Sequence, residues 1–282
     1  MLRPTSPNKN AVAVFRRGLA RLNSLGRWAG SVSAIGATAV LVGCAAVPST
    51  PDGFRYTTIA PFSAGEPGES LPKGWQPWTL SRFKRKTEYQ LVRDGDGTVV
   101  VRAVADSAAS GIIRQVDIDT RVTPWLSWRW RVPEMIAGAD NTDRNREDSP
   151  ARVVVAFEGD HHKLDFEERA IAARVKAMTG NEMPYATLMY ILENQLPVND
   201  VIESRHTTRI NMVVVETGKS RSGKWITFAR NIADDYRRVY GEEPGHVRSI
   251  GILTDTDNTG EKTSAYYGDI KFSATAPTKP LP

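Results

Sequence analysis

Carboxylate side chains near the C-terminus stand at a spacing that could hold a metal ion. The segment 255–260 reads Asp-Thr-Asp-Asn-Thr-Gly. It matches the start of an EF-hand calcium loop, which has oxygen ligands at positions 1, 3 and 5 and glycine at position 6. The match ends at position 12, where Tyr266 replaces the bidentate glutamate. Asp255 and Asp257 are therefore candidate calcium ligands. The alternative is a turn in which Asp and Asn side chains, Asn258 included, cap their own backbone.

A second charged group precedes the apolar run 152–157. Asp148 lies just before this run and Arg152 begins it. One interpretation is a buried Asp–Arg ion pair that only stabilises the fold. The other is acid–base catalysis on a glycan, which needs a second carboxylate across a cleft. Asp255, Asp257 or Asp269 could supply that carboxylate.

Tryptophans alternate with arginines in the segment 125–132. Because side chains along a strand point alternately to its two faces, Trp128 and Trp130 share one face and Arg129 and Arg131 share the other. The tryptophans could stack on sugar rings or belong to the core, and the same two interpretations hold for Trp225. The complete set of candidate ligand-binding residues is Asp148, Arg152, Trp128, Trp130, Asp255, Asp257 and Asn258.

Motifs of common catalytic sites are missing from the sequence. There is no Gly-x-Ser-x-Gly, no phosphate-binding P-loop and no Gly-x-Gly-x-x-Gly. His161 and His162 are adjacent, so on a strand they point in opposite directions, and no His/Cys cluster accompanies them as a zinc site requires. These observations favour binding over catalysis.

Short apolar or alternating runs separated by turn residues predict about ten β-strands. The clearest pair is 87–92 and 98–103, which flank Asp-Gly-Asp-Gly and predict a hairpin. Runs 209–216 and 223–229 predict a second hairpin. The stretch 247–272 predicts a third, with the acidic loop at its tip.

Two segments instead predict helices. Asp165 is a plausible N-cap and Gly180 a plausible C-terminal stop for the first, and the second covers 232–240 and ends at Gly241. The expected fold class is all-β, a jelly-roll type β-sandwich with one or two short inserted helices.

The N-terminal segment indicates export. Six basic and no acidic residues precede Cys44, and the uncharged stretch 28–43 ends in Leu-Val-Gly. Together with the cysteine, this ending resembles a bacterial lipobox, in which the cysteine becomes the lipidated first residue. A transmembrane anchor is the alternative, but the stretch is short for one. Ala45 after the cysteine resembles outer-membrane sorting in enteric lipoproteins.

Removing residues 1–43 changes the charge balance. The whole chain has 37 basic and 32 acidic residues and a net charge of +5. The mature chain would keep 31 basic and 32 acidic residues, a net charge of −1. The composition therefore does not favour a nucleic-acid partner. Cys44 is the single cysteine, so no intramolecular disulfide can form. We expect a signal peptide at 1–43, a flexible tether at 44–70, the β-sandwich domain at 71–273 and a disordered tail at 274–282.

Several motifs in order resemble the bacterial domain of unknown function 3047 (DUF3047). They are Ser127–Val132, Asp148 with Ala151–Val153, Asp234–Tyr236 with Gly241–Pro244, Thr254–Gly260 and Tyr266–Ile270. The resemblance covers about Trp75 to Phe272. It implies an envelope protein with a galactose-binding-like sandwich, the shape of many carbohydrate-binding modules, and no established activity.

The sequence thus predicts a protein held in the cell envelope by a lipid on Cys44, in the outer membrane facing the periplasm. Its β-sandwich is expected to bind a glycan or a protein partner without catalysis, with Ca²⁺ as the one cofactor considered. Two alternatives stay open. One is a glycan-cleaving enzyme using paired carboxylates, and the other is a structural or assembly lipoprotein without a small ligand.

Overall fold

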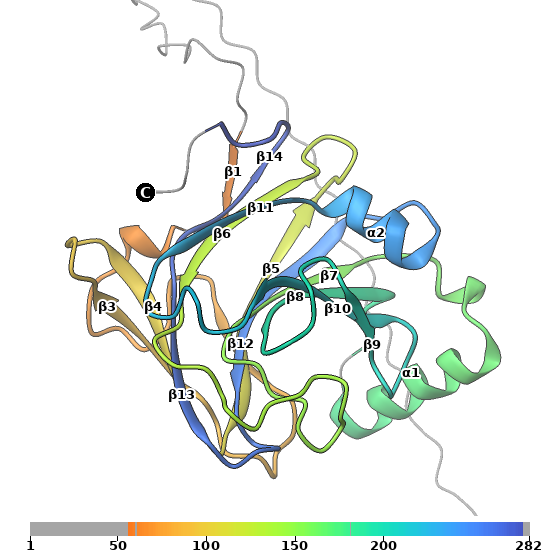
Figure 1. Cartoon of the computed structure of the whole chain (residues 1–282). Coiled ribbons are helices and arrows are strands. Elements are labelled where there is room, and N and C mark those ends of the chain that lie inside the picture. The colour runs from red at the N-terminus through yellow and green to blue at the C-terminus, as the bar shows by residue number, and fades with distance from the viewer. Residues whose placement is uncertain (1–55, 60, 181, 279–282) are drawn as a thin grey trace, which may run out of the picture. The chain divides into compact units, whose positions relative to one another are not determined.

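The computed structural model describes residues 56–59, 61–180 and 182–278 (Figure 1). The predicted signal peptide and Cys44 lie outside these residues. Within the described part of the chain, neither helix has the length and hydropathy needed to cross a bilayer.

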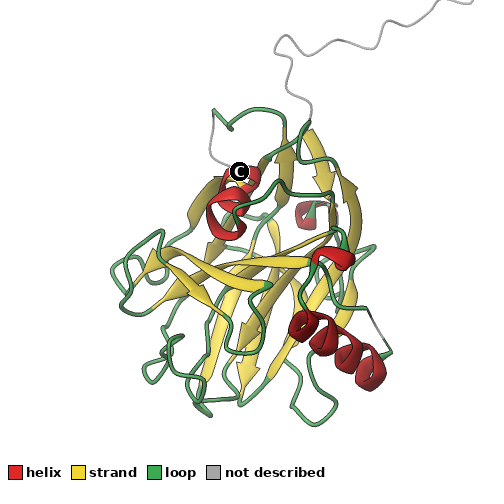
Figure 2. Cartoon of the chain, turned by 90° about the vertical axis from the view of Figure 1, so that its right-hand side faces the viewer, coloured by secondary structure: helices red, strands yellow, loops and turns green. Residues whose placement is uncertain are grey.

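Two β-sheets of seven strands each form the fold. Sheet A has the order β1 (Tyr56–Ile59), β14 (Ile270–Ser273), β6 (Trp125–Arg131), β13 (Lys262–Tyr267), β4 (Val99–Asp106) and β3 (Glu88–Arg93), and β11 (Ile226–Asn231) also pairs with β6. Sheet B has the order β2 (Gln76–Thr79), β5 (Ala109–Ile118), β12 (Val247–Asp255), β7 (Arg152–Phe157), β8 (Ala186–Glu193), β10 (Ile210–Thr217) and β9 (Val201–Glu203). The sheets pack as two layers (Figure 2), which confirms the predicted all-β sandwich.

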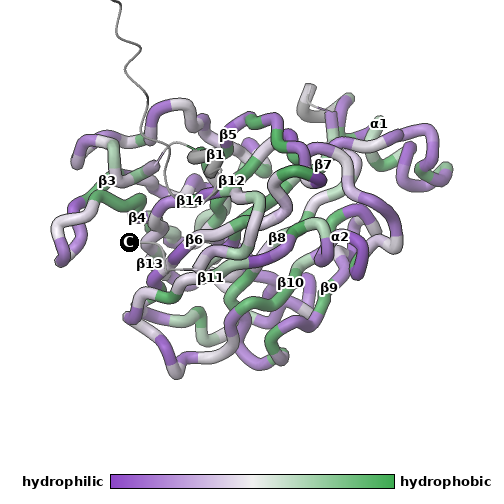
Figure 3. The backbone as a smooth tube through the Cα atoms, turned by 90° about the horizontal axis from the view of Figure 1, so that it is seen from above, coloured by the Kyte–Doolittle hydropathy of each residue, from purple (hydrophilic) through white to green (hydrophobic). Residues whose placement is uncertain are grey.

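The core lies between the sheets and is rich in aromatic residues. Trp128 stacks on Phe228 with ring centroids 5.2 Å apart and contacts Tyr190 at 5.1 Å. Hydrophobic segments gather along the central strands, whereas the connections are mostly hydrophilic (Figure 3). Burial of these large side chains supplies the main stabilising contribution, since no disulfide can form.

Both predicted helices are confirmed, together with their ends. Asp165 caps α1 (Phe166–Thr179) by accepting the backbone N–H of Glu168 at 2.8 Å, and Gly180 ends it in the left-handed conformation. Asn231 caps α2 (Ile232–Tyr240), which ends at Gly241 with φ 70°. Short 3₁₀ turns occur at Phe62–Ala64 and His161–Lys163.

The first predicted hairpin is confirmed, and the other two are wrong. Strands β3 and β4 pair as expected. In contrast, β10 pairs in parallel with β8 in sheet B, whereas β11 pairs with β6 in sheet A. Strand β12 likewise lies in sheet B and β13 in sheet A, so the acidic loop 256–261 crosses from one sheet to the other. Periodicity identifies the buried face of a strand, but not its hydrogen-bonded neighbour.

The described part of the predicted tether belongs to the sandwich. Strand β1 pairs with β14, with Tyr56 opposite Ser273. Phe62 is fully buried against Trp75, and Ser63 donates its N–H and hydroxyl to Asp269 at 2.9 and 2.8 Å. The prolines and glycines in the described part of this segment therefore belong to an ordered connection that packs on the sandwich, and not to a flexible linker. Residues 279–282 of the predicted tail lie outside the described residues.

Candidate functional site

Sheet register brings three of the predicted site carboxylates together. Asp255 ends β12, whose neighbour β7 begins at Arg152, and Asp148 lies just before β7. Asp148, Asp255 and Asp257 each place a carboxylate oxygen within 4.8 Å of the others. We call these three residues the acidic cluster. The sequence identified the two acidic segments but left open whether they meet, and the structure brings them together.

Asp148 organises the acidic loop through hydrogen bonds. One of its oxygens accepts the N–H of Asn258 at 3.2 Å. The other accepts the N–H and the hydroxyl of Thr259, both at 2.7 Å. Asp148 has no exposed surface. The loop is thus capped by a residue more than a hundred positions earlier, besides its internal bond from Gly260 N–H to the Thr256 carbonyl at 2.9 Å.

Asp255 and Arg152 form a buried bidentate ion pair. Arg152 Nε and Nη2 donate to the two Asp255 oxygens at 3.0 and 3.2 Å, and Ser149 N–H donates at 3.1 Å. Arg152 is 2% exposed and Asp255 is 6% exposed. Burial raises the pKa of Asp255 to about 6 against the attraction of Arg152, and the nearby Asp148 charge adds to the rise.

The donor set of the acidic cluster is chemically suited to a hard cation. Asp257 accepts Lys84 Nζ at 2.6 Å, so a cation here would compete with Lys84. Asn141 lies beside the cluster, donating to the Asp148 carbonyl at 3.2 Å, and its buried side-chain oxygen has no hydrogen-bond partner. Oxygen-only ligands suit Ca²⁺. Calcium binding by Asp255 and Asp257 stays a prediction.

The geometry disfavours acid–base catalysis by the acidic cluster. Carboxylates that cleave glycosides flank the scissile bond in a cleft, about 5–5.5 or 6.5–9.5 Å apart. Here Asp148 is saturated by the loop and Asp255 by Arg152, and both are buried. Little of either side chain faces the solvent from which a substrate would approach. The cluster is therefore best described as a buried network that fixes the loop.

Trp128 and Trp130 were candidate ligand-binding residues, but their complete burial makes them core residues instead. Both have no exposed surface, because the inner face of β6 packs against sheet B and β11. Trp130 Nε1 donates to Glu216 Oε2 at 2.8 Å inside the sandwich. Ligand contact by either ring would require opening the core.

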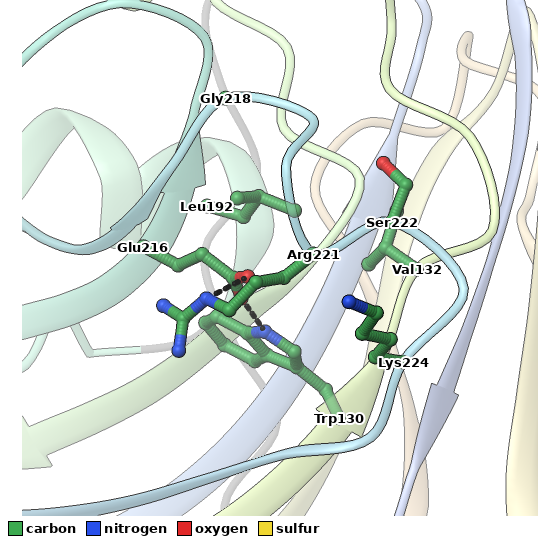
Figure 4. A pocket seen from close by; sticks show the side chains of 8 residues that line it. All are labelled: Trp130, Val132, Leu192, Glu216, Gly218, Arg221, Ser222 and Lys224. Carbon is green, nitrogen blue, oxygen red and sulfur yellow. Dashed lines mark hydrogen bonds and ion pairs between the residues drawn. The ribbon is translucent and has the colours of Figure 1, made fainter.

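A small pocket lies at the edge of Trp130 (Figure 4). It is lined by Trp130, Val132, Leu192, Glu216, Gly218, Arg221, Ser222 and Lys224. Glu216 lies between Trp130 Nε1 and Arg221 Nε, which is 3.2 Å from it (Figure 4). With its carboxylate already neutralised, this pocket is a weak candidate.

The outer face of sheet A carries a group of stacked aromatic and guanidinium side chains. It consists of Arg129, Arg131, Trp225, Tyr266 and Asp94, and we call it the guanidinium–aromatic face. The Arg129 guanidinium lies 4.4 Å from the Trp225 ring centroid, and that of Arg131 lies 4.1 Å from Tyr266 and 5.5 Å from Trp225. Asp94 accepts Arg131 Nη2 at 2.6 Å and Trp225 Nε1 at 2.7 Å.

Strand pairing builds this face from distant segments. Arg131 lies directly opposite Tyr266 across β6 and β13, and Arg129 lies opposite Thr227 on β11. Trp225 precedes β11, and Asp94 follows β3. Trp225 and Tyr266 are partly exposed. The sequence placed Arg129 and Arg131 on the face opposite the tryptophans, but it assigned no role to that face.

Solved structures similar to this chain are distant sandwiches. A family 11 carbohydrate-binding module of the cellulosomal cellulase Lic26A-Cel5E of Clostridium thermocellum is 9% identical, with a TM-score of 0.40, over 78% of this chain and 95% of the module. The xyloglucanase domain of NopAA from Sinorhizobium fredii, in complex with cellobiose, is 8% identical, with a TM-score of 0.39, over 73% of this chain and 94% of that domain. Similarity at this level assigns no ligand.

Family membership rests on a closer match. No curated protein matches the chain. The model of the family described as "Protein of unknown function (DUF3047)" matches residues 73–271, more than two thirds of the 282-residue chain. This range contains every strand that forms the acidic cluster and the guanidinium–aromatic face. The chain belongs to the DUF3047 family.

Proposed function

We propose that this protein is a lipid-anchored envelope protein whose β-sandwich binds a carbohydrate without cleaving it. The observation that carries this proposal is the guanidinium–aromatic face. Two partly exposed aromatic rings, Trp225 and Tyr266, are joined through Arg131 and fixed by Asp94. A pyranose ring has an apolar C–H side that packs on aromatic rings and hydroxyl groups that hydrogen-bond to guanidinium and carboxylate groups.

Preorganisation supports binding at this face. The Trp225 indole is held by the Asp94 carboxylate at 2.7 Å, and the same carboxylate holds Arg131. Such fixed side chains lose little conformational entropy when a ligand binds. Strand β6 also has neighbours on both sides, so its backbone gives the face a rigid base.

Co-sedimentation tests the proposal. The full chain, extracted in detergent, is mixed with peptidoglycan and insoluble polysaccharides, with calcium or with a chelator. The expected result is pelleting with at least one glycan that Trp225→Ala and Tyr266→Ala abolish. Phe83→Ala is the matched control, because Phe83 is 84% exposed on a separate loop.

Each other outcome points to a named alternative. Sugars released into the supernatant would favour the glycan-cleaving enzyme. Pelleting that depends on calcium and on Asp255 and Asp257 would move the binding site to the acidic cluster. No pelleting with any glycan would contradict the proposal and favour a structural or assembly role.

The lipid anchor has its own test. Labelled palmitate should be incorporated into the wild-type chain, and the protein should fractionate with outer membranes. Cys44→Ser should lose both properties while the sandwich keeps its melting temperature, because Cys44 precedes the described domain. Membrane association that survives Cys44→Ser would instead indicate an uncleaved transmembrane anchor.

A further inference from the structure

Arg129 and Arg152 are the two buried arginines in the described part of the chain, and they differ in their partners. Arg129 is 6% exposed, and its guanidinium has no hydrogen bond or ion pair with the described residues. Arg152, by contrast, is paired with Asp255 at 3.0 Å, and the partly exposed Arg209 and Arg230 are paired with Glu242 and Asp235 at 2.7 and 2.5 Å. Because an unpaired charge is unfavourable in a protein interior, buried guanidinium groups are normally paired.

Nearby carboxylates do not supply the missing partner. Asp94 is already shared between Arg131 and Trp225. Asp96 lies in the exposed β3–β4 turn, where hydrogen bonds from Thr98 are the main cause of its lowered pKa and Arg129 is a lesser one. Burial of Nε leaves the two terminal nitrogens of Arg129 as the donors that an incoming anion could meet.

The surrounding backbone positions this guanidinium. Gly268 donates its N–H to the Arg129 carbonyl at 3.0 Å. A Cβ at position 268 would lie 2.5 Å from Arg129 Cγ and 2.6 Å from Nε, so the absence of a side chain there lets Arg129 lie flat. Trp225 covers its other side at 4.4 Å. Arg129 is therefore held in one orientation between a glycine and an indole ring.

From these contacts we infer that the guanidinium–aromatic face binds an acidic saccharide whose carboxylate pairs with Arg129. This inference rests on the proposed function and names its ligand class. A planar guanidinium matches a carboxylate through two parallel hydrogen bonds, while Trp225 and Tyr266 offer surface to the sugar ring that carries it. A hexuronic acid unit has both parts within one ring.

Matched oligosaccharides test the inference by calorimetry on the full chain in detergent. Oligogalacturonate and its methyl ester share a backbone and differ in the carboxylate charge. We expect the acid to bind about tenfold or more tightly than the ester, since a charge-assisted pair is worth roughly this factor. Sulfated galactan oligomers form a third arm.

Four variants test the role of Arg129. Arg129→Gln should abolish the preference for the acid. Gly268→Ala should weaken binding of the acid while keeping the charge, because it displaces the Arg129 side chain. Arg174→Gln, which removes a positive charge on α1, is the matched control and should bind like the wild type. Melting temperatures check folding, and Arg129→Lys serves if Arg129→Gln does not fold.

The outcomes separate the two proposals. Equal binding of acid and ester, unaffected by Arg129→Gln, would overturn the inference and leave carbohydrate binding intact. Binding of none of the three oligosaccharides, by a protein that also pellets with no glycan, would overturn both proposals. Binding of the sulfated oligomers alone, dependent on Arg129, would replace the carboxylate by a sulfate ester and so overturn the ligand class named above.

Discussion

Tryptophans of this sandwich occupy two environments, and their substitution should separate stability from binding. Trp128→Ala removes a fully buried ring that contacts Phe228 and Tyr190, so we expect the free energy of unfolding to fall by about 3–5 kcal/mol. Trp225→Ala removes a partly exposed ring and should lower it by only about 1–2 kcal/mol, with loss of glycan binding. Urea denaturation measures both. Similar losses for the two would mean that Trp225 is also a core residue.

Asp255 should give the sandwich an unusual dependence on pH. Burial raises the pKa of Asp255 to about 6 from 3.8, so the folded state holds this proton more tightly than the unfolded chain does. Stability from this group is therefore present below about pH 4 and is lost as pH rises to about 6. The unfolding free energy of the wild type, relative to Asp255→Asn, should fall across this window in urea denaturation. A relative stability that instead rises would show that the attraction of Arg152 outweighs burial.

At the scale of elements, the crossing loop between β12 and β13 depends on one distant side chain. Asp148→Asn should destabilise the protein by about 1–3 kcal/mol, because it weakens hydrogen bonds to Asn258 and Thr259 in a buried place. Hydrogen exchange of the amides of residues 258–260 should accelerate most. Asp257→Asn is the control, with an expected effect below about 1 kcal/mol. Unchanged exchange rates in Asp148→Asn would mean that hydrogen bonds within the loop are enough to order it.

Sequence patterns predicted the longer strands and both helices, but a correct pairing partner only for the β3–β4 hairpin. Local signals fix strand β4, the cap at Asp165 and the stop at Gly180, because each depends on residues close in sequence. The pairing of β12 with β7 depends on contacts between segments that are distant in sequence, which alternation cannot specify.

The candidate sites also differ in whether they depend on local sequence signals or on contacts between distant segments. The sequence identified charged residues near the ends of predicted strands, because such residues can be recognised without knowing the fold. They are Asp148, Arg152, Asp255 and Asp257. The guanidinium–aromatic face was missed because Asp94, Arg131 and Tyr266 come from three distant strands or turns.

At the scale of the whole molecule, the sandwich begins earlier than its composition indicates. A chain that starts at Tyr56 should melt at the same temperature as the full chain. A chain that starts at Glu66 loses β1, buried Phe62 and the Ser63–Asp269 contacts, and we expect a loss of about 3–5 kcal/mol in unfolding free energy. Calorimetric melting of the two truncated chains makes this comparison. Equal melting temperatures would mean that residues 56–65 do not stabilise the sandwich and that the tether extends to residue 70, as the sequence predicts.

Pairing of β1 with β14 places the first and last strands side by side, with Tyr56 opposite Ser273. The first and last residues of the sandwich therefore lie close together on one side of the domain. A few residues would bridge the two ends, and a circular permutant could then be opened in the exposed turn 94–97. For the same reason, the sandwich could be inserted into a surface loop of a host protein without forcing the host's flanking residues apart.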